Sequence, residues 1–121
     1  MTEPATPALV SFDTPVETSE SAPAPERLLS GKPRQRVANH YADASQQFFA
    51  GVWSSTRGKW RVRYTEHEFC HLLEGRVVVV SDSGERREFS AGDSFVVPSG
   101  FSGTWEVLED CRKLYAIFEP R

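Results

Sequence analysis

The feature that most constrains this chain is a series of short runs rich in Val, Phe, Trp and Tyr, which begins near Gly51 and continues to Phe118. Clusters of Gly, Pro, Asp and Ser separate the runs, and no convincing helix pattern occurs among them. Short strands at this spacing are typical of a β-sandwich or a β-barrel, so the sequence predicts an all-β domain. The expected strands are 51–55, 59–64, 67–73, 76–81, 86–89, 94–97, 103–108 and 112–118.

Turn residues separate the expected strands. Asp82, Ser83 and Gly84 predict a hairpin, because Gly tolerates positive φ and Asp can bond its own backbone nearby. Similar clusters at 91–93 and 98–100 predict two more turns. The apolar run from Val77 to Val80 predicts a strand that is covered on both faces.

The first 26 residues differ from the rest of the chain. They hold five acidic residues, five of the eight prolines and no Lys or Arg. Such a segment buries too little apolar surface to offset its ordering entropy, so residues 1–26 are expected to form a disordered or extended acidic tail. Three apolar residues of the tail could dock as a short strand: Leu9, Val10 and Phe12.

Residues 27–121 are expected to form a single domain, since about 100 residues can bury enough surface to fold unaided. Residues 26–30 predict at most one short helical turn, which Gly31 and Pro33 would end. The net charge of the chain is -3, and without the tail 14 basic side chains stand against 12 acidic ones. This balance predicts neither a nucleic-acid partner nor an anionic membrane.

The sequence also bears on the cellular compartment. The N-terminus lacks a basic segment followed by an apolar run, and no stretch approaches the roughly 18 apolar residues of a membrane span. Cys70 and Cys111 are too few for a disulfide scaffold and form no CxxC pair. A cytoplasmic protein with two reduced thiols is therefore expected.

Two segments resemble the motifs of the cupin superfamily. EFCHLLEG at 68–75 resembles the end of the first cupin motif, and GDSFVVPSG at 92–100 resembles the start of the second. Segments 103–107 and 112–115 resemble the small single-domain cupins grouped with ureidoglycine aminohydrolase and the ethanolamine-utilisation cupin. The resemblance covers residues 28–118. It implies a cupin-type double-stranded β-helix, or jelly-roll barrel, and pairing into a homodimer.

The resemblance also bears on metal binding. Cupins commonly hold Mn, Fe, Ni or Zn with three histidines and one glutamate, a ligand set that suits these ions. Glu68 stands at the glutamate position, but the histidine positions carry other residues: Val62 and Tyr64, or Arg61 and Arg63 if the spacing slips by one, and Gly103. One carboxylate is a poor transition-metal site, so no tightly held metal or other cofactor is expected. A divalent metal held weakly at Glu68 is the alternative.

Strand alternation predicts where the side chains near Glu68 point. One face carries Tyr64, Glu66, Glu68, Cys70 and Leu72, and the other carries His67, Phe69 and His71. With Glu68 inside a barrel, the two histidines are expected to be structural or interface residues. A metal site in a bulged register is the alternative. His40 is expected on the surface, in a loop.

The inward positions predict a pocket with aromatic walls and a few convergent polar groups, which suits a small molecule. The expected ligand-binding residues are Trp60, Tyr64, Glu68, Cys70, Trp105, Lys113 and Tyr115. Trp53 could stack a planar ligand together with Trp60 and Trp105. Glu68 is the best candidate for a catalytic acid or base or for a ligand anchor, although it could merely pair with Lys113.

Two further groups have simpler interpretations. Cys70 is expected to be a small buried residue rather than a nucleophile, because the adjacent His71 points to the opposite face. Arg61 and Arg63 are expected to form a solvated strand edge.

Three functions compete for this sequence. The first is a metal-free cupin that binds a small polar metabolite in its barrel. The second is a hydrolase, lyase or isomerase related to ureidoglycine aminohydrolase, with Glu68 as acid, base or weak metal ligand. The third is a structural dimer that works through contacts with another protein. A homodimer is expected because outward Phe69 and Leu73 would leave an apolar patch on a monomer.

Overall fold

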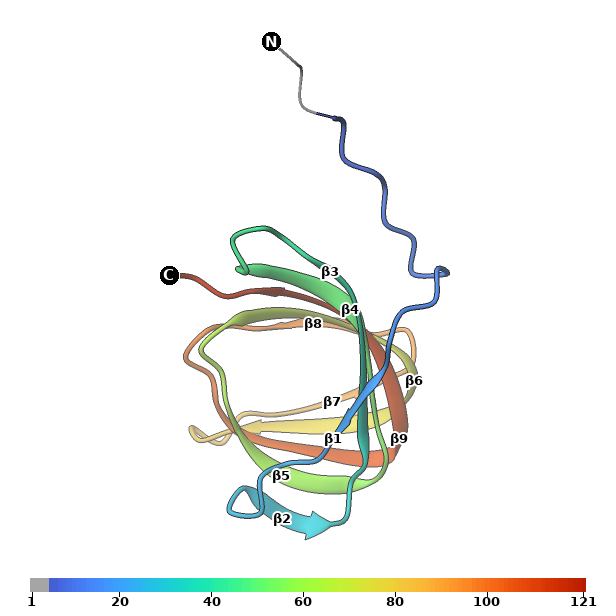
Figure 1. The fold of residues 1–121 in the computed structure, drawn as a ribbon. Coiled ribbons are helices and arrows are strands. Elements are labelled where there is room, and N and C mark those ends of the chain that lie inside the picture. The colour runs from blue at the N-terminus through green and yellow to red at the C-terminus, as the bar shows by residue number, and fades with distance from the viewer. Residues whose placement is uncertain (1–4) are drawn as a thin grey trace.

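The computed structural model describes residues 5–121, and every regular element in this range is a β-strand. Figure 1 shows the strands wrapped around a common interior, with the N-terminal segment leading away from one end. The strands are β1 (Ser19–Ser21), β2 (Leu28–Gly31), β3 (Gln35–Ala42), β4 (Phe48–Ser55), β5 (Gly58–Arg63), β6 (His67–Ser81), β7 (Arg86–Ser90), β8 (Ser94–Val97) and β9 (Ser102–Phe118). The all-β prediction is confirmed. None of the described residues belongs to a helix that could cross a membrane.

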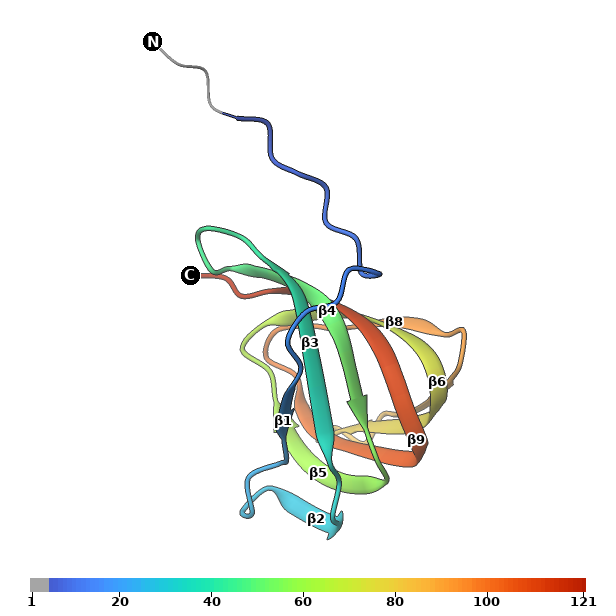
Figure 2. The ribbon, with the colours of Figure 1, turned by 45° about the vertical axis from the view of Figure 1, so that its right-hand side comes forward.

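Two long strands organise the sheet. β6 and β9 run antiparallel, from the pair His67–Phe118 to the pair Ser81–Gly103. The first half of β6 also pairs with β8, and its second half pairs with β7. The first half of β9 pairs with β5, and its second half pairs with β4. The nine strands therefore form one antiparallel sheet that curls around the core (Figure 2).

Each of the two long strands was expected as two separate runs. Runs 67–73 and 76–81 join in β6, and runs 103–108 and 112–118 join in β9. Within β6 the join lies at Gly75, which has a φ of 89°, and the ladder to β9 shifts register on both sides of it. A glycine in this conformation bends the strand without a loop. The bend lets one strand serve both halves of the barrel.

Two segments in the first part of the chain form strands that the sequence analysis did not expect. At most one helical turn was expected at 26–30; a turn ends at Arg27, and Leu28 then starts strand β2. Leu28 pairs with Trp60 of β5, so contact with a distant strand overrides the local helix signal. His40 lies within β3 rather than in a loop, because β3 is held between β1 and β4.

Part of the expected tail lies against the sheet. β1 pairs with the edge of β3, and further upstream the Phe12 ring stacks on His40 with ring centroids 4.5 Å apart. Leu9 is fully exposed. Residues 1–4 of the tail lie outside the described residues, and the boundary between tail and domain at residue 26 stays a prediction.

The core lies inside the curled sheet. Its fully buried large side chains come from β6 and β9: Trp105, Leu72, Val77 and Cys70. Val77, Val78 and Val79 are all buried, which confirms that this part of β6 is covered on both faces. The predicted hairpin is also confirmed, since Gly84 has a φ of 96° and its N–H donates to the Ser81 carbonyl.

Candidate functional site

Strand β6 carries the central residue of the site on its inward face. Glu68, Cys70 and Leu72 are buried, whereas His67 and Phe69 are exposed. This pattern confirms the alternation predicted from the sequence, because side chains of a strand point to opposite faces in turn. Glu68 therefore lies inside the barrel.

The two histidines of β6 are engaged on the other face. Nδ1 of His67 accepts the backbone N–H of Ser99 at 3.1 Å. Nδ1 of His71 lies 2.7 Å from Oγ of Ser94. These contacts tie β6 to β8 and to the turn that follows it, which agrees with a structural role.

A buried ion pair forms the floor of the site. Nζ of Lys113, from β9, lies 3.0 Å from Oε2 of Glu68, and the exposed fractions of the two residues are 4% and 5%. The hydroxyl of Tyr64 donates to the other carboxylate oxygen, Oε1, at 2.9 Å. Both oxygens of Glu68 are therefore engaged within the protein.

Aromatic rings surround the ammonium group of Lys113. Nζ lies 4.7 Å from the ring centroid of Trp53 and 4.4 Å from that of Trp105. Such cation–π contacts stabilise a cation that has been removed from water. Nζ also donates to Sγ of Cys70 at 3.5 Å. The indole N–H of Trp105 is buried and has no hydrogen-bond partner among residues 5–121.

The environment favours the protonated forms of the neighbouring groups. Burial and the nearby Glu68 carboxylate raise the pKa of Tyr64 well above 10.0. Burial also raises the pKa of Cys70 to about 12 and that of Tyr115 to about 12. Burial alone would lower the pKa of Lys113, but the Glu68 carboxylate and Cys70 raise it above 10.5. Lys113 is therefore a cation and Tyr64 a hydrogen-bond donor at neutral pH.

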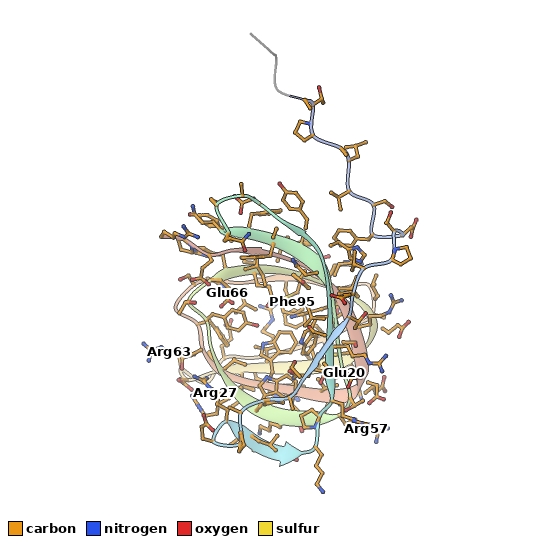
Figure 3. All side chains as sticks on the ribbon, viewed as in Figure 1. Glu20, Arg27, Arg57, Arg63, Glu66 and Phe95 are labelled. Atoms are coloured by element: carbon orange, nitrogen blue, oxygen red, sulfur yellow. The ribbon has the colours of Figure 1, made fainter. Side chains whose placement is uncertain are left out.

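A cavity of about 330 Å³ opens above the ion pair. Its walls are Pro23, Arg27, Gln35, Trp53, Trp60, Arg61, Val62, Arg63, Tyr64, Glu66, Glu68, Trp105, Lys113 and Ile117. Figure 3 looks into the barrel from this side, with Glu66, Arg63 and Arg27 along one edge of the opening. The cavity combines an aromatic interior with a charged mouth.

The structure brings together most of the residues expected at the site. Trp60, Tyr64, Glu68, Trp105 and Lys113 all line the cavity. The expected Glu68–Lys113 pair is present at hydrogen-bond distance.

Two of the expected residues lie elsewhere. Cys70 is buried behind Lys113 and does not line the cavity. Tyr115 lines an adjacent space of about 240 Å³, and its hydroxyl donates to Oδ1 of Asn39 at 2.7 Å. A ligand in the main cavity would therefore meet neither side chain directly.

Other lining residues were not expected from the sequence. Gln35 and Arg27 come from segments whose strands were not predicted, so no signal for them existed. Arg61 and Arg63 are exposed, as expected of a solvated edge, but they also line the mouth of the cavity. Trp53, which the sequence analysis offered as a stacking residue beside Trp60 and Trp105, also lines the cavity.

The positions at which related cupins hold a metal do not fit one here. Among residues 5–121 no three His, Cys, Asp or Glu side chains cluster as a metal site would require. Val62 faces Gly103 in the ladder between β5 and β9. A Cβ atom on Gly103 would lie 2.0 Å from the carbonyl oxygen of Val80, so this backbone leaves no room for a histidine.

Comparison with known proteins agrees with this architecture. The family model of the EutQ-like cupin domain matches residues 42–115. A DUF861-family protein of unknown function from Pseudomonas syringae pv. tomato is similar at 29% identity and a TM-score of 0.78, over 89% of this chain and 46% of that chain. EutQ of Clostridium difficile is similar at 13% identity and a TM-score of 0.64, over 72% of this chain and 64% of that chain.

A smaller relative matches along nearly its full length. The DUF861-family protein of Thermotoga maritima is 23% identical with a TM-score of 0.52, over 82% of this chain and 97% of that chain. The chain spans less than two thirds of the Pseudomonas and Clostridium proteins. No curated protein matches the sequence. The solved structures confirm the jelly-roll barrel that the two motifs predicted.

Proposed function

Because this chain belongs to the EutQ-like cupin domain family, we propose that its barrel cavity binds a small polar metabolite without a tightly held metal. The observation that carries this proposal is the Glu68–Lys113 pair on the cavity floor. A buried ion pair contributes little net stability, because removing two charges from water offsets their attraction. The pair lies beneath an open cavity, and charged groups in a cleft are candidates for ligand binding.

The cavity walls suit a ligand with a flat apolar part. Trp53, Trp60 and Trp105 all line the cavity, and aromatic side chains pack well against planar groups. The amide of Gln35 and the hydroxyl of Tyr64 add polar contacts. Pockets of roughly 300–1,000 Å³ with this mixture bind small molecules.

A thermal-shift screen of ureides, amino acids and small carboxylates tests the proposal. A ligand present at about 100 times its Kd is expected to stabilise the native state by about 3 kcal/mol. Tyr64→Phe and Glu68→Gln are expected to abolish the shift, because each removes a polar contact at the floor. Glu106→Gln is the matched control, because Glu106 alternates with inward Trp105 and Val107 on β9.

The proposal fails if no compound in the screen raises the melting temperature. It also fails if the two floor variants fold and respond to ligand as the wild type does. Melting curves without ligand identify a variant that has not folded, and Tyr64→Phe carries the test if Glu68→Gln is such a case.

Acid or base catalysis by Glu68 is the alternative proposal, as in a hydrolase, lyase or isomerase. The observation in its favour is that the carboxylate reaches an open cavity. In the present arrangement Tyr64 and Lys113 engage both of its oxygens. A substrate would have to displace one partner before proton transfer, whereas a ligand anchored by the pair need not. Binding is therefore the better supported function.

We also propose a homodimer formed through the outer face of β6, β8 and β9. Three large apolar residues are exposed there: Phe69 (46%), Val96 (58%) and Phe118 (47%). Phe69 pairs with Val96 across the ladder to β8, so the two lie side by side. An apolar patch of this kind on a monomer usually marks an interface.

Light scattering during size-exclusion chromatography is expected to give twice the chain mass of 13.6 kDa. Replacing both Phe69 and Val96 with lysine is expected to give monomers, because charges would be buried in the interface. Leu29→Lys on β2 is the control, since Leu29 is equally exposed but lies on another strand. A monomer mass for the wild type across micromolar concentrations would contradict the dimer.

A further inference from the structure

Positive charge is in excess around the barrel cavity. Four cationic and two anionic residues line it: Arg27, Arg61, Arg63 and Lys113, against Glu66 and Glu68. Glu68 and Lys113 neutralise each other on the floor. The excess therefore belongs to the mouth, where three arginines face one glutamate.

Two of these arginines have no acidic partner in the part of the chain that the structure describes. Arg61 is paired with Asp82 at 2.8 Å. No carboxylate among residues 5–121 lies within ion-pair distance of Arg27 or Arg63. The backbone N–H of Arg61 donates to the carbonyl of Arg27 at 2.9 Å, so the turn before β2 is bonded to β5, and Arg27 and Arg63 lie on one side of the opening (Figure 3).

A second cavity shows that this imbalance is local. That space of about 410 Å³ is lined by three arginines and three acidic residues: Arg34, Arg36, Arg112, Glu20, Glu74 and Asp110. Two ion pairs form there, Arg36 with Glu20 and Arg112 with Glu74. Charges on that surface are matched within the protein. At the barrel mouth they are not, so a ligand can supply the missing anion.

The aromatic wall defines the rest of the ligand. The ring centroid of Trp53 lies 6.2 Å from that of Trp60 and 5.9 Å from that of Trp105, with the ring planes inclined by 56° and 72°, so the three indoles form one cluster of tilted rings. A conjugated ring can meet tilted indoles through offset-stacked and edge-to-face contacts, which a compact saturated group cannot make. Guanidinium groups bind carboxylates through two parallel hydrogen bonds. The arginines at the mouth therefore suit a carboxylate in both charge and hydrogen-bond geometry.

We propose that the ligand is a small planar organic anion, an aromatic or conjugated carboxylate. This assignment rests on the proposed function. Its ring lies among Trp53, Trp60 and Trp105. Its carboxylate lies at the mouth and is bound by Arg27 and Arg63. Glu66, the acidic residue of the mouth, disfavours any second carboxylate there, so a monoanion is preferred.

Isothermal titration calorimetry with three naphthalene probes tests this assignment. The probes are 2-naphthoate, the neutral 2-naphthamide and the cationic 2-naphthylmethylammonium ion. The carboxylate is expected to bind about tenfold more tightly than the amide, because its hydrogen bonds to arginine are charge-assisted. The cation is expected to bind most weakly. The preference for the anion is expected to shrink as salt is added, since the mouth is exposed to solvent.

Substitutions at the mouth separate charge from cavity shape. Arg27→Gln and Arg63→Gln are each expected to weaken 2-naphthoate several-fold and to leave 2-naphthamide unchanged. The double variant is expected to bind the two probes equally. Arg57→Gln is the matched control, because Arg57 is an exposed arginine that does not line this cavity and lies on the opposite side of the barrel in Figure 3.

Equal affinity for the carboxylate and the amide would overturn the assignment and leave the proposed function intact, because the cavity would still bind a planar molecule. An unchanged preference in the Arg27 and Arg63 double variant would overturn it in the same way. Failure of all three probes to bind would also overturn it. The proposed function then depends on its own screen of ureides, amino acids and carboxylates.

Discussion

Replacing Lys113 with methionine is expected to lower the free energy of unfolding by about 3–5 kcal/mol, because it leaves the buried Glu68 carboxylate without its partner. Glu68 is buried beneath the cavity, and Tyr64 alone would remain to hydrogen-bond it. Methionine has nearly the volume of lysine without its charge, so packing between Trp53 and Trp105 is largely kept. Urea unfolding followed by tryptophan fluorescence measures the change.

A double variant tests whether the loss of stability comes from the unpaired charge of Glu68 or from the loss of the ion pair itself. Glu68→Leu combined with Lys113→Met removes both charges and is expected to unfold at nearly the wild-type urea concentration, or above it. Arg112→Met is the control, because the neighbouring Arg112–Glu74 pair is exposed and should be worth at most about 1 kcal/mol. Equal losses for Lys113→Met and Arg112→Met would contradict the idea that the Glu68 charge needs Lys113.

The second large effect is expected at alkaline pH, where the free energy of unfolding should fall steeply above about pH 9. Burial raises the pKa of Cys70 from 9.0 to about 12 and that of Cys111 from 9.0 to about 11. Unfolding exposes both thiols, which then release protons that the native state retains. The unfolded state therefore binds fewer protons, and stability decreases with pH through this window.

Each thiol is expected to lower the free energy of unfolding by about 1.4 kcal/mol per pH unit between its unfolded and folded pKa values. The raised pKa of Tyr64 and of Lys113 extends the same trend to higher pH. Unfolding curves in urea at several pH values measure the slope. Cys70→Ala is expected to flatten it between pH 9 and pH 12. A slope that Cys70→Ala leaves unchanged would show that the buried thiol is not its source.

Much of the fold was predictable because its signals are local. Alternation along β6 depends only on the two-residue period of a strand, and it correctly placed Glu68 and Cys70 inside and His67 outside. The hairpin at Gly84 depends on one glycine with positive φ, and the sequence predicted it for that reason. The cupin motifs predicted the barrel, because their glycines and apolar runs mark its turns and walls.

The first forty residues show where local signals end. β2 and β3 form because Leu28 pairs with Trp60 and Val37 pairs with Trp53, and these partners are distant in sequence. The residues at 26–30 indicated at most one helical turn, and nothing near His40 indicated a strand. Pairing with a neighbouring strand determines the secondary structure of such segments, because strand formation depends on cross-strand contacts more than on intrinsic preference.

The sequence by itself determined the kind of site: an inward glutamate at position 68, aromatic walls, and histidine positions of the family filled by other residues. Strand period and residue identity suffice for the first two points, and the resemblance to the cupin motifs supplied the third. The tertiary structure alone decided that the ammonium group of Lys113 lies against two indoles, that Arg27, just before β2, joins Arg63 from β5, and that Cys70 and Tyr115 stay outside the cavity. Such relations depend on strand pairing and on the curl of the sheet, which bring together residues far apart in the chain.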